Sequence, residues 1–221
     1  DAGNLKTKAV RDGDHYIVNG TKSFISGGGY SDVYVTMVRT GDQSSSGIST
    51  LMIEKDCPGI SFGAQEKKMG WNSQPTAQVI FEDCRVPVKN LLGKEGDGFK
   101  IAMKGLDGGR LNIAACSLGT AQSAFERAVE YVGDREQFGN KLQDFQSIQF
   151  KLADMATELE ASRLMLRSAA VKVDENTPDK TKSAAMAKRF VTDLGFKIVN
   201  EALQIHGGYG YLKDYPLERN L

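Results

Sequence analysis

The heptapeptide "GKEGDGF" (residues 93–99) separates two kinds of sequence pattern and decides the fold class. Before it, short runs of β-branched and aromatic residues follow a period of two and are broken by Gly, Asn, Asp and Pro. After it, apolar residues recur every three or four positions over long stretches. The first pattern is typical of strands and the second of helices. We therefore predict an α+β protein with a β-domain at residues 1–92 and a helical domain at residues 93–221.

The β-domain is expected to be a small antiparallel sandwich or open barrel. Its strands are predicted in "HYIVNGTKSFISG", "DVYVTMVRT", "GISTLMIEK", "GISFG" and "AQVIFEDCRVP", and "TGDQSSSG" is expected to be a polar loop. Such regular spacing of short strands favours a sandwich or a barrel. Within the first run, Asn19-Gly20 predicts a hairpin turn, because both residues tolerate positive φ in a type I′ turn.

The second half predicts three long helices of a truncated up-down four-helix bundle. The first, over residues 119–132, ends at Gly133, the second ends at Asn176-Thr177-Pro178, and the third ends at Gly207-Gly208. The fourth helix is expected after Leu221 or from another subunit. The inward residues are predicted to be Ala121, Phe125, Ala128, Val129 and Val132; Phe145, Ile148, Leu152, Met155, Leu159, Ser162 and Leu166; and Ala187, Phe190, Leu194, Ile198, Ala202 and Ile205.

Charge and cysteine usage narrow the function classes. Lys+Arg and Asp+Glu each number 28 in the 221 residues, so the chain has no net positive charge. The composition therefore does not favour binding to nucleic acid or to an anionic membrane. Cys57, Cys84 and Cys116 are isolated in the sequence, and the two histidines are distant from each other, so no metal site is predicted. This cysteine usage suits a reducing compartment.

A few residues of the helical half are candidate ligand contacts, and each has an ordinary structural alternative. Arg135 follows a predicted helix end and would meet a phosphate, or it is simply solvated. Phe138 would pack under a ring or hold its own loop. Gly207-Gly208 would open backbone N–H groups to an anion, or the pair is a glycine helix cap. Gly27-Gly28-Gly29 is most simply a turn.

Five segments in register resemble the flavin-dependent acyl-CoA dehydrogenases over essentially the whole chain. They are "DHYIVNGTKSFISGGG", "PGISFGAQEKKMGWNSQPTAQVIFEDCRVP", "GKEGDGFKIAMKGLDGGRLNIAACSLG", "REQFGNKLQDFQSIQFKLADM" and "ALQIHGGYGYLKDYPLER". Among members of this family, "MGWNSQPT" and "HGGYGYLKDYP" are most similar to the branch that acts on isobutyryl-CoA in valine breakdown.

The resemblance implies that FAD lies between the β-domain and the helices and is reached by residues from two subunits. Phe24 and Ser26 of "SFIS" match the segment that lines the isoalloxazine ring, as a ring wall and a hydroxyl donor. Such an interface cofactor requires at least a dimer, and the family commonly forms dimers of dimers. From the neighbouring subunit, the matching residues are Arg135, Phe138 and Gln146 for the adenosine and diphosphate part, and Gln204, Gly207 and Gly208 for the loop at the pyrophosphate.

The acyl-CoA substrate is expected at "GLDGGR", which matches the start of the helix beside the thioester. Asp107 and Arg110 are the family's residues around this ligand, although a salt-bridged helix start is the alternative. The implied reaction is an α,β-dehydrogenation in which a carboxylate removes the α-proton and a β-hydride passes to the flavin. An electron-transfer flavoprotein then reoxidises the flavin. An acyl-CoA oxidase, or a non-catalytic member used in assembly or interaction, is the alternative.

The catalytic base is not expected within these residues. The family places a glutamate either shortly after "YPLER", beyond Leu221, or one residue before Arg110, where this sequence has Gly109. Asp107 lies about 200° from that position on a helix and does not replace it. We therefore expect this chain to be an inactive fragment of an enzyme. Gly109 widens the pocket for an α-branched acyl group, or it is a glycine tolerated at a helix start. The expected compartment is the mitochondrial matrix in a eukaryote or the cytoplasm in a bacterium.

Overall fold

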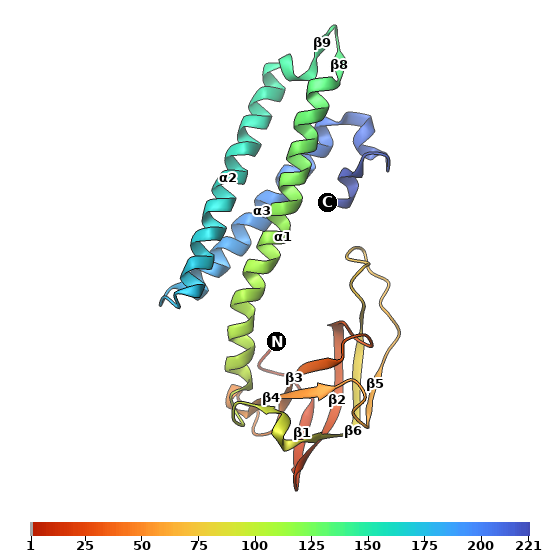
Figure 1. Ribbon diagram of the computed structural model, residues 1–221, viewed down its shortest axis with the longest axis vertical. Coiled ribbons are helices and arrows are strands. Elements are labelled where there is room, and N and C mark those ends of the chain that lie inside the picture. Colours follow the sequence, from red (N-terminus) through yellow and green to blue (C-terminus); the bar gives the residue numbers. More distant parts are fainter. Residues whose placement is uncertain (1) are drawn as a thin grey trace. The chain divides into compact units, whose positions relative to one another are not determined.

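The computed structural model describes residues 2–221, which form two compact units (Figure 1). The sheet unit comprises Asp1–Lys104 and the helical unit Gly105–Leu221. The division between them falls inside the helix α1 (Gly98–Asp134), whereas the boundary predicted from the sequence precedes this helix. None of the described helices is long and apolar enough to cross a bilayer.

Seven strands of the sheet unit form one mixed sheet in the order β5-β6-β2-β1-β3-β4-β7. Neighbouring strands pair antiparallel except β1 and β3, which meet in parallel through Lys8 and Arg39. The α+β class is confirmed, and the parallel pair makes the sheet mixed rather than purely antiparallel. The strands are β1 (Lys8–Asp12), β2 (His15–Ser26), β3 (Val33–Arg39), β4 (Ile48–Glu54), β5 (Ile60–Phe62), β6 (Thr76–Pro87) and β7 (Leu91–Leu92), and two short 3-10 turns, η1 (Ser45–Gly47) and η2 (Val88–Asn90), lie between them.

The hairpin predicted at Asn19-Gly20 is wrong, because β2 continues through both residues. The turn that joins β1 to β2 lies instead at Gly13 and the residue after it. Gly20 has φ 138°, and a Cβ built on it would lie 2.9 Å from the Cα atom of Thr7, so the backbone needs a glycine here. The Asn19 amide donates to the Asp83 carboxylate and accepts from the Asp83 N–H, at 3.0 and 2.8 Å. Close packing and a bulge against β6 therefore explain these residues.

A buried arginine ties the start of the sheet unit to the β3–β4 loop. Only 4% of Arg39 is exposed, and within residues 2–221 its guanidinium donates hydrogen bonds to main-chain carbonyls. Nε donates to Leu5 at 3.1 Å, Nη2 to Gly3 at 2.9 Å, and Nη1 to Ser44 at 2.9 Å and to Asp42. Because a buried charge is costly without partners, these carbonyls are what make its position tolerable.

The long loop between β5 and β6 is held by two side chains. Gln65 donates to the Gly28 carbonyl at 2.9 Å and accepts from the Thr76 N–H at 2.8 Å. Lys68 donates to the Trp71 carbonyl at 2.8 Å and to the Thr76 hydroxyl at 3.0 Å. Trp71 has φ 53°, and 64% of it is exposed. The loop is thus fixed at its base while its single tryptophan faces solvent.

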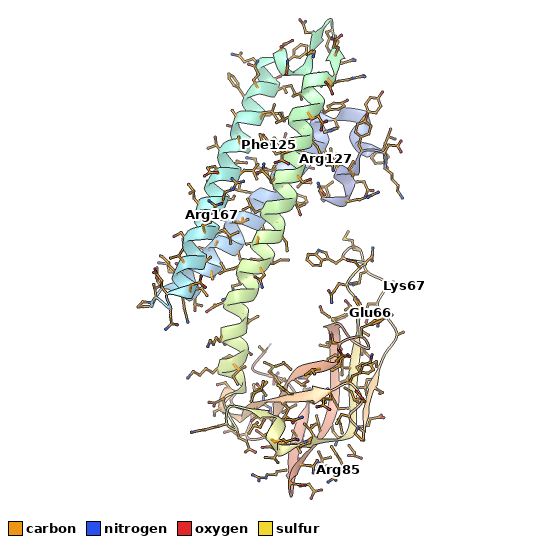
Figure 2. All side chains as sticks on the ribbon, in the orientation of Figure 1. Glu66, Lys67, Arg85, Phe125, Arg127 and Arg167 are labelled. Atoms are coloured by element: carbon orange, nitrogen blue, oxygen red, sulfur yellow. The ribbon has the colours of Figure 1, made fainter. Side chains whose placement is uncertain are left out.

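The helical unit contains three long helices, as predicted. They are α1 (Gly98–Asp134), α2 (Gln146–Asp174) and α3 (Lys180–Ile205), and the short elements are β8 (Glu136–Gln137), β9 (Asn140–Lys141), η3 (Leu142–Asp144), η4 (Gly207–Tyr211) and η5 (Pro216–Arg219). Their core joins Ala121, Ala124, Ala128, Val132, Met155, Leu159, Ile198, Val199 and Ala202, and Phe125 packs against it (Figure 2). The predicted ends of α2 and α3 are confirmed.

The first helix differs from its prediction in two ways. It begins at Gly98 rather than at residue 119, because three glycines at positions 105, 108 and 109 weaken the apolar period without breaking the helix. Val129 was expected to face inward but is 44% exposed, whereas its neighbour Ala128 is fully buried. At about 100° per residue, Val129 points well away from Ala128, and at this turn of α1 Ala128 takes the position that faces the core.

Candidate active site

A cleft of about 360 Å³ opens in the helical unit where α1 ends and α3 gives way to η4. Its lining brings together three of the residues predicted to contact the cofactor, namely Arg135, Gly207 and Gly208. Arg135 lies more than 70 positions before the two glycines in the sequence. The fold joins them because α1 and α3 share the core that ends beside this cleft.

Arg135 is a cation without a carboxylate partner among residues 2–221. No described acidic side chain lies within salt-bridge distance of it. Its guanidinium carbon lies 5.2 Å from the centroid of the Tyr209 ring, which orients the charge but does not neutralise it. Its backbone is fixed as well, because its carbonyl accepts the Leu142 N–H at 2.8 Å. The positive charge is therefore positioned and available to an anion.

The glycine pair forms a helix cap and borders open space. Gly207 has φ 58° directly after the end of α3, as a glycine helix cap requires. A Cβ built on Gly207 or Gly208 would meet nothing within 4 Å, so open space adjoins both backbones. The cap thus also exposes main chain at the wall of the cleft.

An aromatic cluster forms the wall behind Arg135. The rings of Tyr131 and His206 stack with centroids 4.2 Å apart, and Tyr215 meets Tyr131 edge-on at 6.1 Å. His206 Nδ1 lies 2.8 Å from the Ala202 carbonyl, which only accepts, so Nδ1 carries the proton. Burial lowers the pKa of His206 and raises that of Tyr131. Sequence reasoning missed this pair, because no local pattern links Tyr131 on α1 to His206 at the end of α3.

Three other predicted cofactor residues do not line this cleft. Phe138 lies at the tip of the β8–β9 hairpin with φ 56° and 91% exposure, and its ring meets Phe145 edge-on at 6.5 Å. Gln146 is the exposed first residue of α2. Gln204 is exposed on the last turn of α3, whereas the two residues after it face the cleft. All three are exposed and lie outside the lining of the cleft.

Asp107 and Arg110 form a part-buried ion pair on α1. Arg110 Nη1 donates to Asp107 at 2.8 Å, and the Thr181 hydroxyl of α3 donates to the other carboxylate oxygen at 2.7 Å. The prediction that this motif starts a helix is wrong, because α1 begins at Gly98. Asp107 is buried, whereas Gly109 is exposed and has nothing within 4 Å of a built Cβ. The opposite orientation of positions 107 and 109 agrees with their angle on a helix.

The residues predicted to line the flavin ring lie at the end of β2. Phe24 has φ 57° and is 74% exposed, so its ring is not part of the core of the sheet unit. The pairing of β2 with β6 is irregular between Lys22 and Ile25, and this bulge turns Phe24 outward. Ser26 lines a cavity of about 320 Å³ together with Lys22 and Tyr34. Burial lowers the pKa of Lys22.

Comparison with known proteins assigns both units to one family. The acyl-CoA dehydrogenase middle domain matches residues 1–84, and the acyl-CoA dehydrogenase C-terminal domain matches residues 96–221. The chain belongs to the acyl-CoA dehydrogenase family. Both domains occur in the order that the change of sequence pattern at residues 93–99 predicts.

Three members or related structures are similar over the whole chain. Mitochondrial isobutyryl-CoA dehydrogenase of Dictyostelium discoideum is 60% identical, covering 100% of this chain and 53% of its own length. The structure of butyryl-CoA dehydrogenase from Megasphaera elsdenii is 44% identical, with a TM-score of 0.96 and coverage of 100% and 58%. A chain in the structure of the electron transferring flavoprotein of Acidaminococcus fermentans is 49% identical, with a TM-score of 0.95 and coverage of 99% and 57%. The chain spans about half the length of the relatives it matches.

The acyl-CoA dehydrogenase family is FAD-dependent, and the cleft fits the charged part of that cofactor. Arginine side chains and exposed glycine backbone are groups of the kind that binds a diphosphate, and Arg135 and the glycine pair bring both to the wall of the cleft. In the part of the chain that the structure describes, no group of three or more His, Cys, Asp or Glu residues could hold a metal ion.

Proposed function

We propose that the protein catalyses the α,β-dehydrogenation of a short, branched acyl-CoA, with isobutyryl-CoA as the best candidate, and yields the 2-enoyl-CoA. The observation that carries this proposal is the 60% identity to isobutyryl-CoA dehydrogenase of Dictyostelium discoideum across the whole chain. That similarity includes the sheet unit and the helical unit together. A shared fold alone would not support a substrate, because one fold hosts many functions.

FAD is the proposed cofactor, and residues of both units are assigned to its parts. When bound, FAD supplies the acceptor for the hydride that leaves the β-carbon. Arg135 neutralises the diphosphate, and Gly207-Gly208 let it approach the main chain. Phe24 offers its exposed ring to the flavin ring and keeps water from it, and Ser26 offers a hydroxyl donor.

The remaining cofactor contacts imply more than one subunit. Phe138, Gln146 and Gln204 are exposed, as residues that meet the cofactor of a neighbouring subunit would be in a single chain. We propose a homo-oligomer, with a dimer of dimers as the expected state.

For the acyl-CoA substrate, Arg110 and Asp107 are the proposed contacts, and Gly109 leaves room for the α-branch. Asp107 does not act as the base, because both of its oxygens already accept hydrogen bonds, from Arg110 and Thr181. We therefore assign proton abstraction to a carboxylate other than Asp107. A base must reach the α-proton directly, which the orientation of Asp107 toward α3 prevents.

An electron-transfer flavoprotein is the proposed electron acceptor. The support is the chain of 49% identity in the structure of the electron transferring flavoprotein of Acidaminococcus fermentans. The proposed compartment is the mitochondrial matrix in a eukaryote or the cytoplasm in a bacterium.

The test is anaerobic reduction of the full-length, FAD-loaded protein by acyl-CoA thioesters. The rate of reduction is measured as the loss of flavin absorbance. Isobutyryl-CoA is expected to bleach the flavin faster than butyryl-CoA. Faster bleaching by butyryl-CoA would refute the substrate and retain the reaction. No bleaching by any acyl-CoA would refute the enzymatic function itself.

A further inference from the structure

Two cysteines that are separated by 27 positions meet in the sheet unit. The Sγ atoms of Cys57 and Cys84 lie 3.3 Å apart, although the sequence suggested three isolated thiols. Cys57 is partly exposed in the turn that precedes β5, and Cys84 is fully buried within β6. The third cysteine, Cys116, is exposed on α1 and belongs to the helical unit.

The backbone around these cysteines keeps them together. Gly59 has φ 90°, and a Cβ built on it would lie 2.7 Å from the Cα atom of Cys84 and would collide with the Glu82 carbonyl. The Gly59 carbonyl accepts the Glu82 N–H at 2.8 Å, and the Cys57 carbonyl accepts the Ile60 N–H at 3.1 Å. The turn at residues 57–59 is therefore pressed directly onto β6. The sulfur contact follows from this close approach of two backbones and does not depend on a flexible side chain.

The two thiols differ in their access to solvent. Cys57 lines a cavity of about 470 Å³ whose wall also carries His15, Arg85 and Lys89. Its thiol donates to the Arg85 carbonyl at 3.1 Å. Burial, followed by the hydrogen bond with Cys57, raises the pKa of Cys84 to about 12. A small oxidant therefore reaches Cys57 from the cavity, while Cys84 lies buried next to Cys57 as a protonated thiol.

We propose that Cys57 and Cys84 form a reversible redox modification site, in which peroxide oxidises Cys57 and Cys84 converts the product into a disulfide. In the first step the Cys57 sulfur attacks hydrogen peroxide, the O–O bond breaks, and a sulfenic acid and one water form. In the second step the Cys84 sulfur attacks the Cys57 sulfur, and the Cys84 proton leaves with the departing hydroxide as a second water. Two thiols and one peroxide thus give one disulfide and two waters.

Formation of the disulfide requires only a small movement of the two sulfur atoms. A disulfide has an S–S bond of about 2.05 Å, so the sulfur atoms must approach by about 1.3 Å from the present separation. The turn at residues 57–59 is on the surface, whereas β6 is paired with β2 over most of its length, so we expect the turn to move. Oxidation would then anchor this turn covalently to β6.

The experiment treats the reduced 221-residue chain with hydrogen peroxide, alkylates it under denaturing conditions and measures its intact mass. The reduced chain is expected to take up three alkyl groups and the oxidised chain one, on Cys116. Peptide mapping of the unsubstituted chain must find Cys57 linked to Cys84, and dithiothreitol must restore three alkylations. Three alkylations after peroxide, linkage through Cys116, or a sulfinic acid on Cys57 without a disulfide would each overturn the proposal.

Single substitutions separate the roles of the two sulfurs. With Cys84→Ala, peroxide is expected to leave a sulfenic or sulfinic acid on Cys57, because no resolving thiol is present. With Cys57→Ala, Cys84 is expected to stay reduced, and Cys116→Ala is the matched control that retains the disulfide. Oxidation of Cys84 in Cys57→Ala at the rate seen in the unsubstituted chain would refute the assigned order. The peptide map needs no substitution, so the disulfide is tested even where a variant fails to fold.

Discussion

Replacing Arg39 with methionine should destabilise the sheet unit strongly. The guanidinium donates to four main-chain carbonyls and is buried, and methionine keeps part of the apolar stem but none of the donors. A hydrogen bond from a charged donor contributes about 1.5–3 kcal/mol. Removal of the buried charge offsets part of the loss, and water reaches some of the freed carbonyls, so we expect a net loss of about 3–5 kcal/mol.

Amide hydrogen exchange in β1 and β3 is the appropriate assay, because it reports the opening of the sheet unit separately from the helices. The amide of Arg39 itself donates to the Thr7 carbonyl at 2.8 Å and is one such probe. Arg85→Met is the matched control: Arg85 is exposed and pairs with Asp12 at 3.3 Å, so its loss should cost less than about 1 kcal/mol. Equal effects of the two substitutions would refute the reasoning, because the four carbonyl contacts would then contribute nothing measurable.

Four further predictions concern the helical unit and the proposed site. Asp107→Ala breaks a buried ion pair and should lower the free energy of unfolding by about 2–4 kcal/mol in urea titration, whereas Asp193→Ala at an exposed pair should change it by under about 0.5 kcal/mol. Arg135→Met in the full-length protein should weaken FAD retention on gel filtration at least tenfold while leaving the thermal midpoint of the apoprotein unchanged. Burial lowers the pKa of His206, so the folded state binds the imidazole proton less tightly than the unfolded chain does. The stability linked to His206 is therefore complete above about pH 6.5 and should fall as the pH drops below that value. His206→Gln should flatten the fall of the thermal midpoint with decreasing pH in this range. Gly109→Ala should stabilise α1 by about 0.8–1 kcal/mol, because the added methyl meets only open space, while slowing turnover of the α-branched substrate in the full-length protein.

Periodicity predicted the elements of this fold well because it reports which face of a segment is buried. The strands β3, β4, β5 and β6 and the ends of α2 and α3 all follow from it. It failed where a tertiary contact overrode a local signal. Asn19-Gly20 reads as a turn, but close packing against Thr7 uses the glycine inside a strand. The start of α1 was missed because its glycines are poor helix formers.

Only those residues of the candidate site that belong to short sequence motifs could be predicted from the sequence. Resemblance of segments suggested Arg135 and the glycine pair, and the fold brings them to one cleft. The stacking of Tyr131 on His206 joins residues 75 positions apart and leaves no local pattern. The same is true of the Cys57–Cys84 contact, which depends on a turn that meets β6. Tertiary packing decides which side chains of different helices and strands meet. The hydrophobic period of one segment does not contain this information.

The anchored loop between β5 and β6 gives the protein a built-in optical reporter. Trp71 is the only tryptophan of the chain, and it stands in solvent on a base fixed by Gln65 and Lys68. Its fluorescence therefore comes from a single known position and needs no label. Any molecule that covers this loop would shift the emission to shorter wavelength, whereas a flavin bound nearby would quench it by energy transfer. Contacts made by the sheet unit can thus be followed in real time with the unmodified protein.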